Sequence, residues 1–273
     1  MSKYTIIGGR GFIGSHIVSL LESRGHDVTI PDRSELDSIS GNLGKVIYCA
    51  GNGDCANSYF SVLEANTTLL AKVLQHYEFE KLVYISSTRV YMNNSGSSEK
   101  DDLTITTSDN RKLFNLTKLV AEELCIKSDC NVAVVRPSNV YGLALNSKLF
   151  LPSIIRNAIN DGEINMFVAP DYAKDYVSVS DVAESCIWIA DNTTNKEIYN
   201  VASGFNVTAQ EIADVIQEET ECNVNWKTGC FPREEFPVTN IEKLASLNPK
   251  FKPQHVLNDL KLMIESYKKE LAS

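Results

Sequence analysis

The chain has 273 residues, of which 43% are hydrophobic and 22% charged, so we expect one large α/β domain, alone or with a smaller lobe. Its formal charge of −9 argues against nucleic acid as a partner, because a phosphate backbone requires a basic face. Seven cysteines without CxxC or Cys/His metal spacing predict free thiols and no metal site. No run of about 18 apolar residues occurs, and the first residues enter a strand at once. We therefore expect a cytoplasmic protein without a membrane span or signal peptide.

A glycine-rich turn follows the first predicted strand. Residues 4–7 form a short apolar run, and Gly8, Gly11 and Gly14 lead into a helical face that includes Ile13. A helix N-terminus presents unpaired N–H groups, and glycines remove the Cβ atoms that would keep a pyrophosphate from the backbone. The turn predicts a dinucleotide site; the alternative is an ordinary tight turn.

The second predicted strand, 28–30, leads to Asp32, which lies 24 residues after Gly8. A carboxylate at this position can accept hydrogen bonds from the ribose hydroxyls of an adenosine, and it repels a 2′-phosphate. The neighbouring Arg33 could attract such a phosphate. We therefore predict NAD as the cofactor and leave NADP open. Residues 34–37 could form a short third strand.

A buried strand over 45–51 ends in the small residues Ala50 and Gly51, which would let a cofactor lie against the backbone. A long amphipathic helix is predicted over 58–77. Asn66 lies inside this helix, where an asparagine more often forms local hydrogen bonds than takes part in catalysis.

Strands and helices continue to alternate up to residue 140. A strand at 82–85, a polar loop at 92–110, a helix at 112–125 and a strand at 132–135 follow one another. This order predicts an α/β, Rossmann-type doubly wound parallel sheet with its ligand crevice at the carboxyl ends of the strands.

Beyond residue 140 the pattern loosens, as expected of an added lobe. We expect a dinucleotide-binding domain over 1–140 that also receives about 175–202, and a substrate-binding lobe mainly over 141–273. The predicted elements here are helices at 151–159 and 181–190, strands at 176–179 and 198–201, a capping box at 208–211 that opens a helix to 218, and a final helix over 256–267.

Several motifs in this order resemble the extended short-chain dehydrogenase/reductases, the group of NAD-dependent epimerases, dehydratases and reductases that mostly act on nucleotide-sugars. The resemblance covers nearly the whole chain. The motifs are the glycine turn with Phe12-Ile13, Ser86-Ser87-Thr88-Arg89-Val90-Tyr91, Lys118 with Glu122, the segments 136–142 and 174–183, Tyr199-Asn200-Val201, and Leu247-Asn248-Pro249.

The resemblance implies roles for individual residues. Ser87 would hold the reacting oxygen of the sugar, although a serine at a strand end can also bond local backbone. Thr88 and Asn139 would contact the nucleotide-sugar, although Asn139 could be a turn residue. Apart from the resemblance, an arginine fork suits diphosphate oxygens, so Arg233 or Arg156 in the lobe could contact the substrate, although neither matches a family pattern and at least one could be a surface ion-pair residue. The implied cofactor-binding residues are Gly8, Gly11, Phe12, Ile13, Gly14, Asp32, Arg33, Ala50, Gly51, Ser86, Lys118 and Pro137. A homodimer through the helices at 58–77 and 112–125 is also implied, although apolar faces on those helices could equally pack on the sheet.

One position departs from the family pattern. The family places a catalytic tyrosine four residues before the lysine, and Phe114 stands there instead, one helical turn from Lys118. Positioned acid–base catalysis is worth about 10² to 10⁴ in rate. Three explanations remain: an engineered Tyr-to-Phe change, a natural phenylalanine with Tyr91, Ser87 or Thr88 delivering the proton, or a natural non-catalytic binder.

Two functional hypotheses from different classes follow. The first is an NAD-dependent nucleotide-sugar epimerase, dehydratase or 4-ketoreductase with impaired or altered acid–base catalysis at Ser87, Phe114 and Lys118. The second is a dinucleotide-dependent binding or regulatory protein without turnover. In a third, weaker hypothesis the glycine turn is purely structural.

Overall fold

The central element is a six-stranded parallel sheet, which confirms the predicted α/β Rossmann-type class. The computed structural model describes residues 1–32, 41–144, 147, 149–227, 229 and 234–271, so the strand expected at 34–37 lies outside the described residues. The strands are ordered β2-β1-β3-β4-β5-β9. Their bounds are β1 Lys3–Ile7, β2 Asp27–Thr29, β3 Lys45–Tyr48, β4 Lys81–Ile85, β5 Val132–Pro137 and β9 Glu197–Val201.

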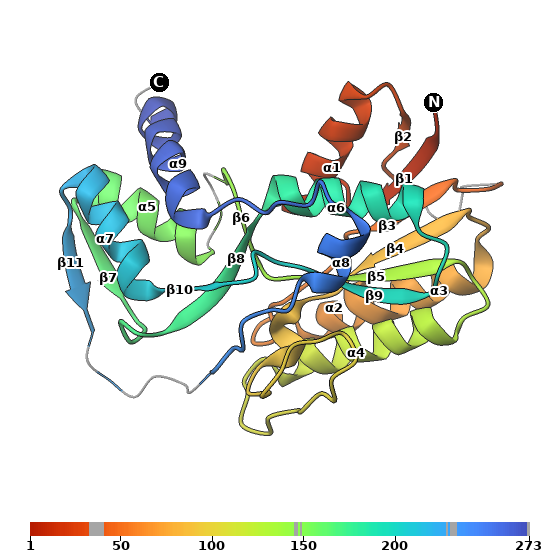
Figure 1. Cartoon of the computed structure of the whole chain (residues 1–273), viewed down its shortest axis with the longest axis horizontal. Coiled ribbons are helices and arrows are strands. Elements are labelled where there is room, and N and C mark those ends of the chain that lie inside the picture. Colours follow the sequence, from red (N-terminus) through yellow and green to blue (C-terminus); the bar gives the residue numbers. More distant parts are fainter. Residues whose placement is uncertain (33–40, 145–146, 148, 228, 230–233, 272–273) are drawn as a thin grey trace.

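Helices cover both faces of this sheet, as its continuous apolar strands require (Figure 1). On one face α1 (Phe12–Ser23) and α6 (Val179–Asn192) lie side by side over a core that includes Ile6, Val83 and Val135. The other face is covered by α2 (Tyr59–Leu63), α3 (Leu69–His76) and α4 (Lys112–Lys127). With both faces covered, ligands reach the sheet only at its edges and strand ends.

The helix expected over 58–77 is interrupted by a π-helical turn, η2 (Glu64–Thr68). Two tyrosine hydroxyls from the sheet reach its carbonyl oxygens: Tyr48 donates to Ala65 (2.7 Å) and Tyr84 to Asn66 (3.0 Å). The Asn66 amide donates to the backbone oxygen of Asn52 (3.0 Å) and to Oγ1 of Thr117 (3.1 Å). Partners outside the helix thus take over groups that a regular α-helix would satisfy internally.

The second half of the chain builds a lobe with a separate hydrophobic core (Figure 1, left). A three-stranded sheet in the order β10-β8-β6 connects this lobe to the central sheet, and β7 pairs with β11 at its far end. The bounds are β6 Asn139–Tyr141, α5 Phe150–Asp161, β7 Glu163–Met166, β8 Ala173–Ser178, β10 Asn206–Thr208, α7 Ala209–Thr220, β11 Asn223–Trp226, α8 Glu242–Leu247 and α9 Val256–Leu271.

Local signals in the lobe explain where its helices begin. The capping box is present: Thr208 Oγ1 accepts from the Glu211 N–H (3.1 Å), and the Glu211 side chain accepts from the Thr208 N–H (2.8 Å). Ser178 caps α6 in a similar way by accepting from Asp181 N (3.0 Å), so this helix begins at Val179, two residues before the expected start. None of the helices in the described part of the chain has the length and apolarity needed to cross a bilayer.

Candidate active site

The glycine turn forms one wall of a cavity of about 320 Å³ at the carboxyl end of β1. Gly8 has φ +85°, and a Cβ there would lie 2.6 Å from Ala50 N. Gly14 packs so closely that a Cβ would collide with the Gly8 carbonyl oxygen. The turn between β1 and α1 is therefore pressed against the end of β3, which only glycine permits. The cavity is lined by Ile7, Gly8, Gly9, Arg10, Gly11, Ile30, Pro31, Asp32, Cys49, Ala50, Gly51 and Leu69.

Asp32 lines this cavity, as the sequence predicts for a ribose-binding acid. Its carboxylate forms an ion pair with Arg10, the exposed residue inside the glycine turn. The side chains of Arg10 and Asp32 are 66% and 46% exposed, so the pair contributes little to stability. Arg33 lies outside the described residues.

Phe12 and Ile13 begin α1 and are only partly buried, and neither lines the cavity. A Cβ on Gly142, at the end of β6, would lie 3.2 Å from Phe12 Cζ, so the Phe12 ring packs on that turn. The structure therefore places these two residues beside the glycine turn, where they support it.

Lys118 lies behind Gly51, one of the residues that line this cavity, and does not itself line it. It is 4% exposed, and Nζ donates a hydrogen bond to the carbonyl oxygen of Ile85 at the end of β4 (2.8 Å). A Cβ on Gly51 would lie 3.5 Å from the same nitrogen. Burial lowers the pKa of Lys118 to about 8, against the opposing charges of Glu122 and Cys49. The ammonium group should therefore lose its proton at a lower pH than an exposed lysine.

A buried polar network lies behind β4 and β5. Ser86 donates to Glu122, and Arg136 binds the same carboxylate through Nε (3.0 Å) and Nη2 (2.5 Å). Arg136 also donates from Nη1 to the Tyr91 hydroxyl (2.6 Å), which donates to Asn200 Oδ1 (2.9 Å). Burial opposes the charge of Arg136, but hydrogen bonding to Glu122 and the charge of Glu122 raise its pKa above the ordinary value.

Three residues considered for the site lie in or next to this network. The Ser86 hydroxyl is engaged by Glu122, and Ser86 lines neither the glycine-turn cavity nor the larger cavity described below. Pro137, the last residue of β5, is also buried and lines neither. Tyr91 is 1% exposed with its hydroxyl held by Arg136 and Asn200, which argues against it as a replacement proton donor.

A second cavity, of about 430 Å³, lies between the sheet and the lobe and brings together Ser87, Thr88 and Asn139. Ser87 Oγ accepts a hydrogen bond from Arg89 N (3.1 Å) and so caps the 3₁₀ turn η3 (Thr88–Tyr91). The local role considered for Ser87 is thus real, yet its O–H can still donate into the cavity. Asn139 donates to the Asp175 carbonyl oxygen (2.8 Å), which anchors β6 to β8.

Phe114 lies on α4 between two cations. The guanidinium of Arg111 is 4.9 Å from its ring centroid, and Lys118 Nζ is 5.7 Å from it. Both contacts are of the cation–π kind. The ring occupies the position at which the family pattern places a phenol, but it carries no titratable proton.

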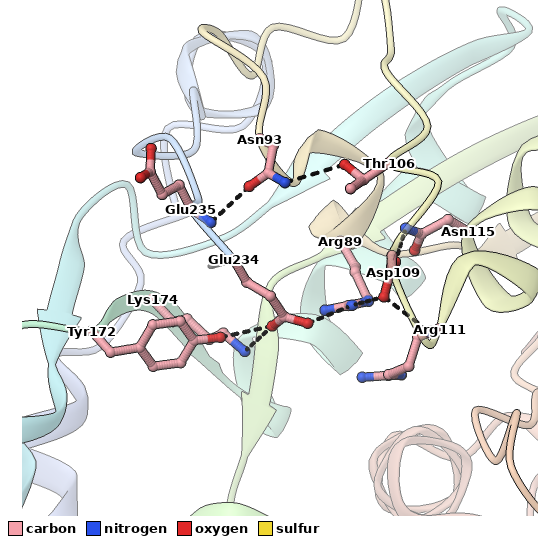
Figure 2. Close-up of polar contacts among 10 residues, drawn as sticks. All are labelled: Arg89, Asn93, Thr106, Asp109, Arg111, Asn115, Tyr172, Lys174, Glu234 and Glu235. Atoms are coloured by element: carbon pink, nitrogen blue, oxygen red, sulfur yellow. Dashed lines mark hydrogen bonds and ion pairs between the residues drawn. The ribbon is translucent and has the colours of Figure 1, made fainter. Parts of the chain in front are cut away.

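Sequence reasoning missed three cations that line the larger cavity: Arg89, Arg111 and Lys174. Figure 2 shows Glu234 between Arg89 and the pair Tyr172 and Lys174. Arg89 Nη2 is 2.8 Å from both Asp109 Oδ1 and Glu234 Oε1. Tyr172 donates to Glu234 Oε2 (2.8 Å), and Lys174 Nζ lies 3.7 Å from that oxygen. Arg89 follows directly after Ser87-Thr88 in the sequence, and this adjacency could have indicated that Arg89 belongs to the same site.

A comparison with protein-family models adds an independent observation. The model described as the NAD dependent epimerase/dehydratase family matches residues 4–202. The chain belongs to this family. The match runs from β1 to just beyond β9 and so includes the whole central sheet and the residues of both cavities up to β9.

Individual relatives are more distant. The chain is 26% identical over 254 residues to a UDP-N-acetyl-alpha-D-glucosaminuronate decarboxylase of Bacillus cytotoxicus, with 79% of each chain covered. It is 24% identical over 250 residues to a probable GDP-L-fucose synthase 1 of Oryza sativa, covering 79% of this chain and 76% of that one. Among solved structures, MoeE5 in complex with UDP-glucuronic acid and NAD superimposes with a TM-score of 0.83 at 21% identity, covering 98% and 99% of the two chains. A dTDP-glucose 4,6-dehydratase of Bacillus anthracis in complex with NAD gives a TM-score of 0.80 at 18% identity, covering 98% and 97%. The structural likenesses support the fold.

Proposed function

We propose that the protein binds NAD in the glycine-turn cavity and a nucleotide-sugar in the larger cavity, as an oxidoreductase of the epimerase, dehydratase or 4-ketoreductase kind. The observation that carries this proposal is the position of α4. Its Lys118 borders the glycine-turn cavity through Gly51, and its Phe114 lies beside Arg111, a residue of the larger cavity. One helix thus joins the two binding regions, as hydride transfer between cofactor and sugar requires.

For the cofactor, the donor set fits a dinucleotide. The N-terminal N–H groups of α1 and the bare backbone at Gly8 and Gly11 suit a pyrophosphate, and the Asp32 carboxylate suits ribose hydroxyls. Lys118 would donate to the second ribose. When bound, NAD would supply a hydride acceptor at the sugar carbon. The family description names NAD, and Asp32 disfavours the 2′-phosphate of NADP.

For the substrate, Ser87 and Thr88 would hold the reacting sugar oxygen. Asn139 and Lys174, on β6 and β8, would hold the diphosphate from the side of the lobe. The known complexes of MoeE5 contain nucleotide-sugars, which supports the same ligand class for this chain. Arg233 keeps its proposed substrate role, although it lies outside the described residues.

The proton is the unusual part of the reaction. Phe114 cannot supply it, and the Tyr91 hydroxyl is engaged elsewhere. Ser87 and Thr88 remain as hydroxyls within the larger cavity. An exchange through serine or threonine is slow because these hydroxyls are poor acids, so we propose an enzyme with weakened acid–base catalysis.

The test is Phe114→Tyr, assayed chromatographically for conversion of a panel of nucleotide-sugars with NAD and of 4-keto nucleotide-sugars with NADH, because an epimerase or dehydratase regenerates its NAD. If the site is a weakened oxidoreductase, the restored phenol should raise the rate by about 10² to 10⁴ on at least one member. The control is the double variant Phe114→Tyr/Lys118→Met, which should lose most of the gain. No gain with any nucleotide-sugar would contradict the proposal.

A second candidate is a non-catalytic binder that senses NAD or a nucleotide-sugar. The observation that favours it is that Phe114 carries no titratable proton at the position where catalysis would need a hydroxyl, while the Tyr91 hydroxyl is held by Arg136 and Asn200. Such a binder should bind both ligands yet never exchange a hydride. Slow NADH formation by the natural sequence in a single-turnover assay would rule it out.

We further propose a homodimer formed through α2 and α4. Large apolar side chains are exposed on these neighbouring helices, where packing on the sheet does not account for them. They are Tyr59, Phe60, Leu63, Leu116, Val120 and Leu124. A cytosolic location also stays a prediction, supported by the free thiols of the described cysteines.

A further inference from the structure

The charged side chains that line the larger cavity are all cations, although Asp109 and Glu234, which lie outside the lining, pair with two of them. Its lining includes Arg89, Arg111 and Lys174, and no carboxylate belongs to the lining among the described residues. This contrasts with the whole chain, whose formal charge is −9. A concave wall of one sign within a protein of the opposite sign concentrates ligands of opposite charge. The cavity is therefore suited to a ligand that carries several negative charges.

Arg89 is fixed in this wall from behind. Asp109 and Glu234 bind its Nη2, and the side chain is only 8% exposed. Burial would raise the pKa of Glu234, but hydrogen bonding to Arg89 and the charge of Arg89 bring it down to about 2. Arg89 Nε is buried and has no hydrogen-bond acceptor among the described residues. A buried N–H without a partner is costly, so a ligand atom that accepts it would be favoured.

Arg111 supplies the charge that the surrounding residues do not neutralise. Three cations face two carboxylates in this cluster, and the guanidinium of Arg111 has no ion pair among the described residues. Its main-chain N–H donates to Asp109 (2.8 Å), while its guanidinium lies over Phe114. In Figure 2 no dashed line reaches that guanidinium. Stacking uses the flat face of the group and leaves its N–H edge open for a planar anion.

The positions of the cations divide the cavity into two ends. Lys174 lies on β8 in the lobe, at the side proposed for the diphosphate. Arg89 and Arg111 come instead from the sheet domain, one directly after Ser87-Thr88 and the other at the start of α4 beside Phe114. Figure 2 shows Lys174 and Arg111 on opposite sides of Glu234. The second pair of cations therefore lies at the reacting end, where the sugar would be.

We propose that Arg89 and Arg111 form a carboxylate subsite, and that the nucleotide-sugar recognised by this protein is an acidic sugar of the uronate class. This inference rests on the proposed function and narrows its substrate. Arg111 would bind the carboxylate through its free N–H edge, and Arg89 would add the N–H of Nε. A neutral hexose would offer these groups only an uncharged hydroxyl oxygen in place of a carboxylate.

The test is calorimetric binding to the NAD-loaded protein of two matched pairs: UDP-glucuronate against UDP-glucose, and GDP-mannuronate against GDP-mannose. Within a pair the ligands differ only in the sugar carboxylate. The acidic member of at least one pair should bind about 10-fold or more tightly than the neutral member. Arg111→Gln should remove most of this preference, while Lys174→Gln should weaken both members equally. Lys127→Gln, at the exposed far end of α4, is the control for a lost charge.

The outcomes separate the two proposals. Equal binding of acidic and neutral members, or an equal loss for both in Arg111→Gln, would overturn the carboxylate subsite while leaving nucleotide-sugar binding intact. No binding by any of the four ligands would overturn the proposed function and this inference together. Because Arg111 is exposed and Arg111→Gln is expected to fold, circular dichroism can verify that its effect is local.

Discussion

The guanidinium of Arg111 lies 4.9 Å from the ring centroid of Phe114. Phe114 is one helical turn before Lys118 on α4. Lys118 Nζ lies 5.7 Å from the same centroid, so two cations approach one uncharged ring. Two nearby positive charges favour a negatively charged group at position 114. The local electrostatics therefore still suit a phenolate, although the residue that would form one is absent.

This relationship predicts the behaviour of a restored tyrosine. In Phe114→Tyr, the two cations should lower the pKa of the new phenol below its ordinary value of about 10. Ultraviolet difference titration of the phenolate, with the natural sequence as the blank, measures this pKa. The double variant Phe114→Tyr/Arg111→Gln should show a smaller decrease. An unshifted phenol in the single variant would mean that neither cation acts on position 114.

The buried ammonium of Lys118 predicts how stability depends on pH. Its pKa is about 8 in the folded protein and 10.5 in the unfolded chain, so between these values the unfolded chain binds more protons. Stability should therefore rise as the pH increases through this window. From pH 7 to pH 9 the contribution of Lys118 is about 1 kcal/mol.

Urea unfolding at these two pH values checks the effect. Lys118→Met should be the more stable protein at pH 7 and should show a smaller gain at pH 9. Lys81 and Lys174, whose pKa values burial also lowers to about 8, should retain part of the rise in this variant. The same pH response in both proteins would show that Lys118 does not titrate in this range.

The glycine turn offers a matched pair of substitutions. Gly8 and Gly25 both have positive φ, +85° and +74°, but a Cβ on Gly8 would meet Ala50, whereas a Cβ on Gly25 would meet open space. Gly25→Ala should therefore cost about 1 kcal/mol for backbone strain alone. Gly8→Ala should cost about 3 kcal/mol in the free energy of unfolding, because overpacking is added.

NAD binding gives the second readout for this pair. Gly8→Ala should also weaken NAD binding, since the turn must move away from β3, and Gly25→Ala should leave it unchanged. Thermal unfolding and calorimetry measure the two quantities. Equal losses of stability in both variants would contradict the close approach of Gly8 to Ala50.

The exposed apolar face on α2 and α4 predicts a surface that can be disrupted without unfolding. Val120 is 51% exposed on α4, so Val120→Glu should fold normally and convert a dimer to a monomer in analytical ultracentrifugation. Leu262→Glu is the control, because Leu262 is 63% exposed on α9 in the lobe. A natural chain that sediments as a monomer would refute the dimer.

The sheet and its helices could be predicted because each depends on nearby residues. The periodicity from β1 through the glycine turn to α1 and the capping box at Thr208 are local signals, and both agree with the structure. The π-helical turn at 64–68 could not be predicted in this way. It depends on hydroxyls of Tyr48 and Tyr84, which lie far along the chain from the groups that they bind.

In the candidate site, too, the residues that depend on local sequence could be predicted, and the contacts between distant residues could not. Ser87, Thr88 and Asn139 reach one cavity because the carboxyl ends of neighbouring strands share one edge. Ser86 was expected to contact the cofactor, but its hydroxyl binds Glu122, and successive side chains at a strand end point to opposite faces. The pairing of Arg89 with Glu234 joins residues 145 positions apart, and no period in the sequence marks such a pair.

Glu234 also connects the sheet domain to the lobe, and these two parts would have to separate for the larger cavity to widen. Its carboxylate holds Arg89 of the sheet domain on one side and Tyr172 and Lys174 of the lobe on the other. Its side chain is 22% exposed, so dissolved ions reach this junction and screen it. An increase in ionic strength should therefore weaken the contacts of this carboxylate with Arg89 and Lys174, and ligand entry and release should become faster.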